Sequence, residues 1–256
     1  MKYPFAEEMA DTGLFLRLRP KAEFEMFQVM GERASGTNYI RKIMELNTTI
    51  RRTDALGWKH GFPTMVAIPP NLLTICAMRH AEAWALSMHK RPWHAHPNIQ
   101  KLEFSEFIRS PWVGIVDRLG DFETLHDEIR PHVTGRTLEL DRHPLTGAPF
   151  PNLFALRRAK LLSLVGMLNR DCSVALLQME TATMVPEALI TALRMATGAE
   201  GKGPAFKTPK RRMGNNFRRS VAARPETPKA MSDDDRAFMR SQLDVELEAA
   251  LGYVYD

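Results

Sequence analysis

Three short, mostly apolar runs have the length and composition of buried strands. They cover residues 24–30, 72–78 and 173–178, and each is followed by a stretch with apolar residues at helical spacing. Strands that alternate with helices favour a mainly parallel sheet covered by helices on both faces. The pattern therefore predicts an α/β fold, a three-layer αβα arrangement, and a single domain over residues 1–256.

Residues 152–170 carry an apolar stripe typical of a long amphipathic helix. Pro186 stands where another helix begins, and Gly198 marks its end. Ser232 and Asp235 resemble a helix cap, so we expect a last helix after Ser232.

Composition places the chain among folded proteins, since 44% of its 256 residues are hydrophobic and 25% are charged. No apolar run approaches the roughly 18 residues of a membrane span, and the acidic first eleven residues do not resemble a secretory signal. Cys76 and Cys172 each lie inside an apolar run, which favours buried free thiols. We therefore expect a cytoplasmic protein with no membrane span.

Positive charge is concentrated in residues 199–230, where no acid occurs between Lys202 and Glu226. The stretch is long and lacks helical or strand periodicity, which is typical of a functional or disordered loop. Such charge suits nucleic acid, an anionic membrane surface or a small polyanion. Charge alone does not distinguish among these partners.

Residues 31–38 (Gly-Glu-Arg-Ala-Ser-Gly-Thr-Asn) join the first predicted strand to a helix. Backbone N–H groups in such a turn, with the positive end of the helix, form an anion site, although a plain structural turn has the same pattern. The segment has no lysine before Ser35 or Thr37 and so lacks the G-x-x-x-x-G-K-[ST] pattern. The sequence therefore predicts a P-loop-like phosphate-binding turn but disfavours an ordinary ATPase or GTPase.

Four further segments follow this turn in a recognisable order: residues 58–63, 79–87, 179–180 and 217–220. With Ser35-Gly36-Thr37 they resemble, in chain order, the 5'-phosphosulfate loop, the histidine segment, the first 3'-phosphate motif, the Y-E-D-L segment and the second 3'-phosphate loop of sulfotransferases that use 3'-phosphoadenosine-5'-phosphosulfate (PAPS). The resemblance runs from residue 26 to about residue 220. It implies transfer of a sulfuryl group from PAPS to a hydroxyl acceptor by in-line displacement, leaving adenosine 3',5'-bisphosphate (PAP).

The resemblance also implies a role for individual residues. His60, Lys59 and Arg33 would act in the reaction, and the loop 199–230 would close over the nucleotide. The expected nucleotide-binding residues are Arg33, Ala34, Ser35, Gly36, Thr37, Asn38, Tyr39, Arg79, Ser87, Phe217, Arg218 and Arg219.

The chain departs from the family pattern at several positions. Ala34 stands in place of the loop lysine, so either Arg33 or Lys59 must supply that cation. In the first 3'-phosphate motif, His80, Ala81 and Ala83 replace Asn, Pro and Asp. These differences point to a divergent bacterial branch.

His60 has the chemistry of a general base, because an imidazole with a pKa near neutrality can take the proton of an attacking hydroxyl. Lys59 beside it would stabilise charge that develops on the leaving phosphate. An isolated histidine is more often structural, and its place between the two nucleotide motifs is what favours catalysis here.

Residues 91–97 contain a His-x-His pair but no evident third ligand, so we expect no metal. The same segment holds Trp93, which suits contact with a sugar ring, and residues 131–151 are a second candidate for the acceptor side. Arg51 and Arg52 would suit an anionic acceptor. The expected partner is a small-molecule or glycan acceptor, with a saccharide hydroxyl preferred.

Two other functions fit parts of the pattern. A P-loop-like nucleotide-dependent kinase would bind ATP with magnesium in preference to PAP. A nucleic-acid-binding module would use the basic stretch, yet only Phe206 and Phe217 interleave its charges, so we expect no nucleic-acid partner.

Overall fold

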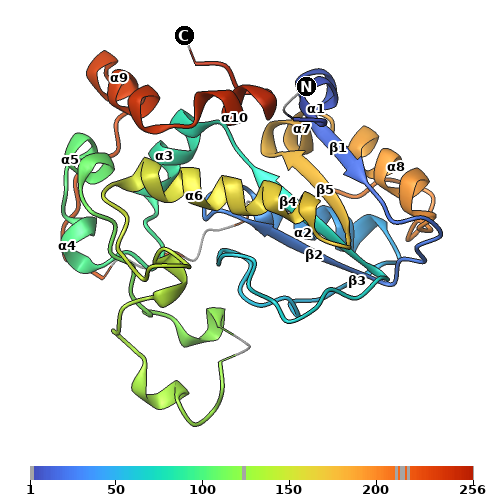
Figure 1. Ribbon diagram of the computed structural model, residues 1–256, viewed down its shortest axis with the longest axis horizontal. Helices are drawn as coiled ribbons and strands as arrows, with labels where there is room; N and C mark the ends of the chain where they lie inside the picture. The colour runs from blue at the N-terminus through green and yellow to red at the C-terminus, as the bar shows by residue number, and fades with distance from the viewer. Residues whose placement is uncertain (1–2, 123–124, 211–212, 214–216, 218–219, 256) are drawn as a thin grey trace.

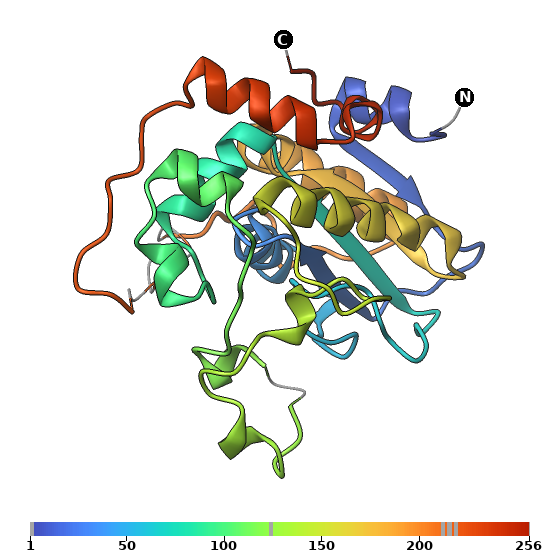
Figure 2. The ribbon, with the colours of Figure 1, turned by 60° about the vertical axis from the view of Figure 1, so that its left-hand side comes forward.

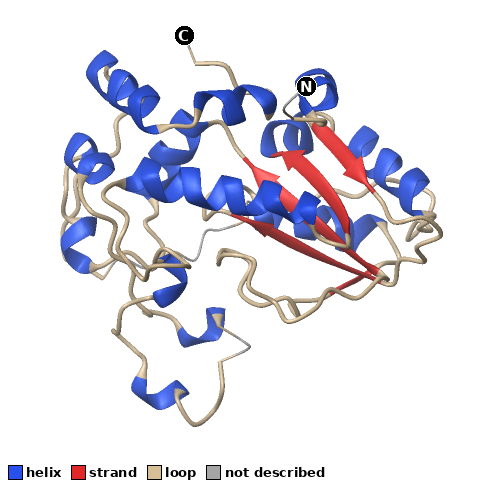
Figure 3. Ribbon diagram, viewed as in Figure 1, coloured by secondary structure: helices blue, strands red, loops and turns tan. Residues whose placement is uncertain are grey.

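The computed structural model describes residues 3–122, 125–210, 213, 217 and 220–255, and a five-stranded sheet forms its centre (Figures 1 and 3). The strands lie in the order β1-β5-β4-β2-β3. Strands β2, β3, β4 and β5 are parallel, and β1 pairs antiparallel with β5. The prediction of an α/β fold with a mainly parallel sheet is confirmed. The strands are β1 (Leu14–Arg17), β2 (Met26–Gly31), β3 (Arg51–Arg52), β4 (Leu72–Met78) and β5 (Ser173–Gln178).

Burial explains which strands the sequence pattern reveals. Strand β4 is buried at every position, and β2 and β5 are buried at all but one, as expected of parallel strands covered on both faces. The pattern did not predict the edge strands. Strand β1 is only partly buried, and β3 consists of two arginines.

Two apolar clusters cover the opposite faces of the sheet. On one face, α2 (Thr37–Asn47) and α8 (Pro186–Thr197) pack against side chains such as Phe27 and Ile75. On the other face, α6 (Leu153–Val165), α1 (Ala6–Thr12) and α10 (Val245–Ala250) pack against side chains such as Cys76. The two faces alternate along each strand, as the pleat requires.

A third apolar cluster, which includes Trp84 and Phe107, lies among the helices beside the sheet. It is built from α3 (Ala81–Lys90), α4 (Pro97–Gln100), α5 (Phe104–Arg109), α9 (Asp233–Gln242) and the first turns of α6. The chain between α5 and α6 projects below this cluster in Figures 1 and 2 as a lobe of loops and short turns. The remaining helical turns are η1 (Leu119–Asp121), η2 (Arg130–His132), η3 (Glu139–Asp141), η4 (Gly166–Asn169) and α7 (Met179–Met184).

Several predicted helix ends are confirmed. The Ser232 side chain accepts a hydrogen bond from the N–H of Asp235 at the start of α9, and Gly198 ends α8 in the left-handed conformation. Cys76 and Cys172 are buried free thiols, as expected. No helix in the described parts of the chain is both long and apolar enough to cross a bilayer.

Candidate functional site

A cavity of about 1140 Å³ opens where strands β2 and β4 end. Ligands of α/β proteins bind at this edge of a parallel sheet, because the loops that leave the strands converge there. Its walls come from the β2–α2 loop, the segment after β3, helix α3, the start of α7 and part of the basic stretch. The cavity therefore brings together four of the five segments that carry the sequence resemblance, and the fifth, residues 217–220, contributes no lining residue among those that the structure describes.

The β2–α2 loop is a tight turn with two residues in the left-handed region. Ala34 has φ 62° and Gly36 has φ 81°, and a Cβ on Gly36 would lie 1.8 Å from Met179 Sδ. Gly36, Thr37 and Asn38 line the cavity at the start of α2, where the first N–H groups of a helix have no intrahelical acceptor.

Ser35 has a different place from the one predicted for it. Its side chain is fully buried, and its hydroxyl donates to the Glu32 carbonyl at 2.7 Å. The hydroxyl thus stabilises the turn from inside, and Ser35 does not line the cavity, whereas its neighbours Ala34 and Gly36 do.

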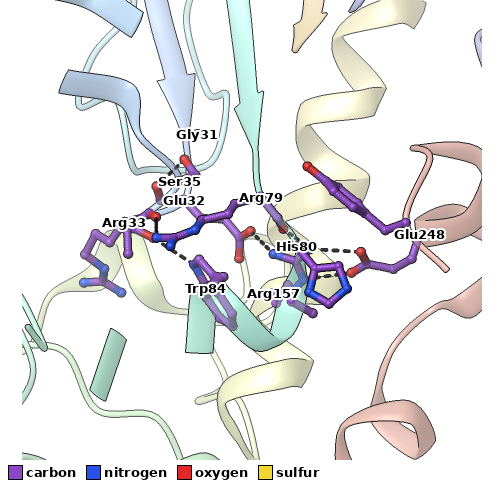
Figure 4. A network of polar contacts seen from close by, with 12 residues as sticks. Gly31, Glu32, Arg33, Ser35, Arg79, His80, Trp84, Arg157 and Glu248 are labelled. Carbon is purple, nitrogen blue, oxygen red and sulfur yellow. Dashed lines mark hydrogen bonds and ion pairs between the residues drawn. The ribbon is translucent and has the colours of Figure 1, made fainter. Parts of the chain in front are cut away.

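The two candidates for the missing loop cation lie in different surroundings. Arg33 is buried and forms an ion pair with Asp141 at 2.7 Å, and Figure 4 shows its side chain extending away from Arg157. Lys59 Nζ donates to Asn38 Oδ1 at 2.6 Å, beside the first turn of α2. Burial and the nearby Arg41 lower the pKa of Lys59 to about 8. Of the two candidates, Lys59 is therefore the one whose charge lies beside the first turn of α2.

His60 is held in one tautomer by the backbone of β2. Its Nδ1 lies 2.7 Å from the Gly31 carbonyl, which can only accept, so Nδ1 carries the proton and Nε2 keeps the lone pair. Burial and the neighbouring Lys59 charge hold the pKa of His60 well below its usual value. A neutral imidazole that lines the cavity is thus available as a base.

Asp141 connects the loop to the histidine segment, a role that sequence reasoning did not find. Its carboxylate forms an ion pair with Arg33 at 2.7 Å and accepts hydrogen bonds from Trp112 Nε1 at 3.0 Å and Lys160 Nζ at 3.2 Å. Lys160 in turn donates to the His60 carbonyl at 2.6 Å. Burial opposes a charge on Asp141, but Arg33 and Lys160 lower its pKa to about 2. No local pattern marks Asp141, because its partners come from distant segments.

Arg79 and Ser87 come together as the resemblance implies. Arg79 follows β4, and its Nη1 donates to Ser87 Oγ at 2.8 Å and to the Ala34 carbonyl at 3.0 Å. Helix α3 returns Ser87 to the strand end, since eight residues span about two turns. Both side chains line the cavity. One hydrogen-bonded group thus joins the second motif to the loop of the first.

A buried ion network lies beneath this group (Figure 4). Arg157 from α6 donates to Glu32 at 2.8 Å, to both oxygens of Glu248 at 2.7 and 2.9 Å, and to the Arg79 carbonyl at 2.7 Å. The Tyr255 hydroxyl also donates to Glu248. The strand ends that carry the loop and Arg79 are therefore fixed by α6 and α10.

Glu32 makes the network sensitive to pH. Burial raises the pKa of Glu32 to about 7. Arg157 opposes this rise, but its one guanidinium faces two carboxylates, Glu32 and Glu248. A raised folded-state pKa stabilises the fold at low pH, and this contribution is lost as the pH rises through about 7.

We expect Glu32→Gln to stabilise the protein, relative to the wild type, more at about pH 8 than at about pH 5, as measured by urea unfolding. The exposed Glu106→Gln serves as control, and an equal effect of Glu32→Gln at both pH values would contradict the prediction.

The basic stretch lies against the same cavity. Pro209, Lys210 and Met213 line it, and the ring of Phe217 meets the ring of Trp93 edge-on at 5.2 Å. Arg218 and Arg219 lie outside the described residues, so their predicted contacts stay predictions. Tyr39, the predicted adenine contact, also lines the cavity.

The His-x-His pair does not converge on one point. His94 is buried, with Nδ1 2.7 Å from Asp117 and Nε2 3.3 Å from Asp121, whereas His96 caps α4. Burial opposes a charge on His94, but its contacts with the carboxylates of Asp117 and Asp121 raise its pKa. Within the described ranges, no group of three or more His, Cys, Asp or Glu side chains is arranged to hold a metal ion.

No known protein family, curated protein or solved structure matches this chain. Functional inference therefore depends on the cavity and on the motifs that line it.

The charges of the cavity favour an anionic ligand. Among the described residues that line it, nine are lysine or arginine and three are aspartate or glutamate. A concave surface with this excess of cations concentrates the field of its charges on whatever binds there. The arrangement suits a ligand with several negative charges, held beside a neutral histidine.

Proposed function

We propose that the chain is a sulfotransferase that transfers a sulfuryl group from PAPS to a hydroxyl acceptor, with a saccharide hydroxyl preferred. The observation that carries the proposal is the meeting of Arg79, Ser87 and the β2–α2 loop on the wall of one cavity. His60 lines the same cavity with Nε2 as its proton acceptor.

Different walls of the cavity would bind different parts of the nucleotide. Arg79 and Ser87 would bind the 3'-phosphate, and the first turn of α2 with Lys59 would bind the 5'-phosphosulfate. Tyr39 would contact the adenine, and the loop 199–230 would close over the nucleotide. The finer fold proposed with this function is a three-layer αβα domain whose β2–α2 loop is the phosphate-binding turn.

PAPS, when bound, supplies the sulfuryl group. His60 Nε2 would take the proton from the acceptor hydroxyl as its oxygen bonds to sulfur and the bond from sulfur to the phosphate oxygen breaks. Lys59 and the N–H groups of the turn would stabilise the charge that develops on the departing PAP. Asp141 and Lys160 would hold His60 in position through its backbone.

Ligand-dependent thermal unfolding tests the nucleotide site. A ligand at about 100 times its Kd adds roughly 2.7 kcal/mol, so saturating PAP should raise the Tm by roughly 5–10 °C in a domain of this size. We expect PAP to raise the Tm more than ATP does, and Arg79→Ala to abolish the PAP shift.

Arg136→Ala is the matched control, because Arg136 is exposed and does not line the cavity. It should keep the full PAP shift. A larger magnesium-dependent ATP shift would favour the kinase instead. A PAP shift that is absent, or that persists in Arg79→Ala, would refute the proposed site.

A further inference from the structure

The two ends of the cavity differ in charge. We define the Arg79 end by the lining residues Arg79, Lys90, Arg91, Lys210 and Glu180. Here four cations accompany one carboxylate, and that carboxylate accepts hydrogen bonds from the Tyr253 hydroxyl at 2.9 Å and the His80 N–H at 3.0 Å. This end is suited to a polyanion.

The opposite end, which we call the Trp58 end, is close to charge balance. We define it by the lining residues Arg52, Asp54, Trp58, Trp93, His94, Arg118 and Asp121. Arg52 forms an ion pair with Asp54. Asp121 pairs with Arg118 at 3.5 Å and with His94 Nε2 at 3.3 Å. Arg52 and Arg118 therefore each face a carboxylate of the chain itself.

This end adjoins the candidate base. The ring of Trp58 meets those of His60 and His94 edge-on at 5.3 and 5.4 Å. Asp54 and Asp121 lie close enough to Lys59 to raise its pKa, against the larger lowering by burial and Arg41. A molecule that lies among Asp54, Asp121 and the aromatic rings would therefore bring a hydroxyl close to His60.

An acidic acceptor fits this end poorly. Its carboxylate or sulfate would approach Asp54 and Asp121, and like charges that meet at an interface disfavour binding. Arg51 and Arg52, which the sequence offered for an anionic acceptor, do not supply a compensating charge. Arg51 does not line the cavity, and Arg52 is already paired.

A neutral, hydroxyl-rich acceptor fits it well. A carboxylate has about four lone-pair sites, so Asp54 and Asp121 can each accept a hydroxyl while they remain paired. Their side chains are 25% and 36% exposed, which leaves room for this contact. Trp58 and Trp93 add ring surface on which the carbon skeleton of a sugar can lie.

We infer that the acceptor is an uncharged, polyhydroxylated molecule of the saccharide class, bound at the Trp58 end with Asp54 and Asp121 accepting its hydroxyls. The inference rests on the proposed transfer from PAPS. In the reaction, the acceptor oxygen bonds to sulfur, the bond from sulfur to the PAP oxygen breaks, and the proton goes to His60 Nε2. Asp54 and Asp121 thus select the acceptor and take no part in the bond changes.

Transfer of labelled sulfate from PAPS tests the acceptor class. The probes are cellotetraose and maltotetraose as neutral tetrasaccharides, and tetragalacturonate as an acidic one. We expect kcat/KM to be at least about tenfold higher for a neutral probe, because the carboxylates of the acidic probe meet the like charges of Asp54 and Asp121. We expect Asp54→Asn and Asp121→Asn to raise KM for the neutral probe about tenfold and to reduce the discrimination against tetragalacturonate.

Asp127→Asn is the matched control, since Asp127 is 97% exposed in the projecting lobe. It should leave both kinetic constants unchanged. The PAP-induced Tm shift is measured on every variant, so that a folding defect is seen directly. Preference for tetragalacturonate, or no transfer to any of the three probes by a protein that binds PAP, would overturn the inference. Failure to bind PAP would refute the proposed function itself, and the inference with it.

Discussion

Replacing His60 with glutamine should lower kcat for sulfuryl transfer by about 10²–10⁴-fold, the usual contribution of a general base. The amide of glutamine can still donate a hydrogen bond to the Gly31 carbonyl, but it cannot take a proton at neutral pH. We therefore expect the Kd for PAP to stay near the wild-type value. Initial rates and PAP binding measured on the same protein separate the two effects.

The pH dependence supports the same assignment. Because burial and Lys59 hold the pKa of His60 well below its usual value, the base form should persist through neutral pH and be lost only in acid. Lys59→Met removes one of these two causes, so the acid limb of the kcat/KM profile should move to higher pH. His126→Gln, at an exposed position outside the cavity, should change neither rate nor profile. A His60→Gln protein of wild-type rate would show that another group is the base.

Replacing Arg157 with methionine should lower the free energy of unfolding by about 3–5 kcal/mol, the range found when one partner of a buried ion pair is removed. The substitution leaves Glu32 and Glu248 buried without their guanidinium. Urea unfolding at pH 7 measures the loss. PAP binding should weaken as well, because Arg157 also bonds to the Arg79 carbonyl.

The adjacent Arg158→Met is the matched control, because Arg158 is exposed on the same helix. It should change stability little. Adding Glu32→Gln and Glu248→Gln to Arg157→Met should recover part of the loss, because the uncompensated charges are then gone. A loss in Arg157→Met no larger than in Arg158→Met would show that the network contributes little.

The central elements of the fold were predictable because burial on both faces leaves continuous apolar runs. Strand β4 is the clearest example, with seven apolar or small residues that are all buried. The edge strands were not predictable, because β1 and β3 are defined by their partners more than by their own residues. The cap at Ser232 was predictable because it depends on residues three apart.

The candidate site also contains contacts that were predictable from the sequence and contacts that were not. Arg79 and Ser87 were paired correctly, since a helix fixes the distance between residues eight apart. Arg33 was predicted to bind phosphate, but it forms a buried ion pair with Asp141. No local sequence pattern around Asp141 indicates this contact. The anchoring of His60 on Gly31 was equally hidden. Long-range pairs of this kind leave no signal in one sequence.

The ion network around Arg157 bears on how the chain folds during synthesis. Arg157 bonds to Glu32, 125 residues earlier, and to Glu248, 91 residues later. On the ribosome, a nascent chain that has emerged only as far as α8 contains Arg157 but not yet Glu248, which accepts two hydrogen bonds from its guanidinium. The core around β4 and α6 would then enclose an incompletely matched charge, which favours an open, chaperone-accessible intermediate until α10 emerges. The β2–α2 loop would thus be completed late, and a pause in translation before α10 would lengthen the lifetime of that intermediate.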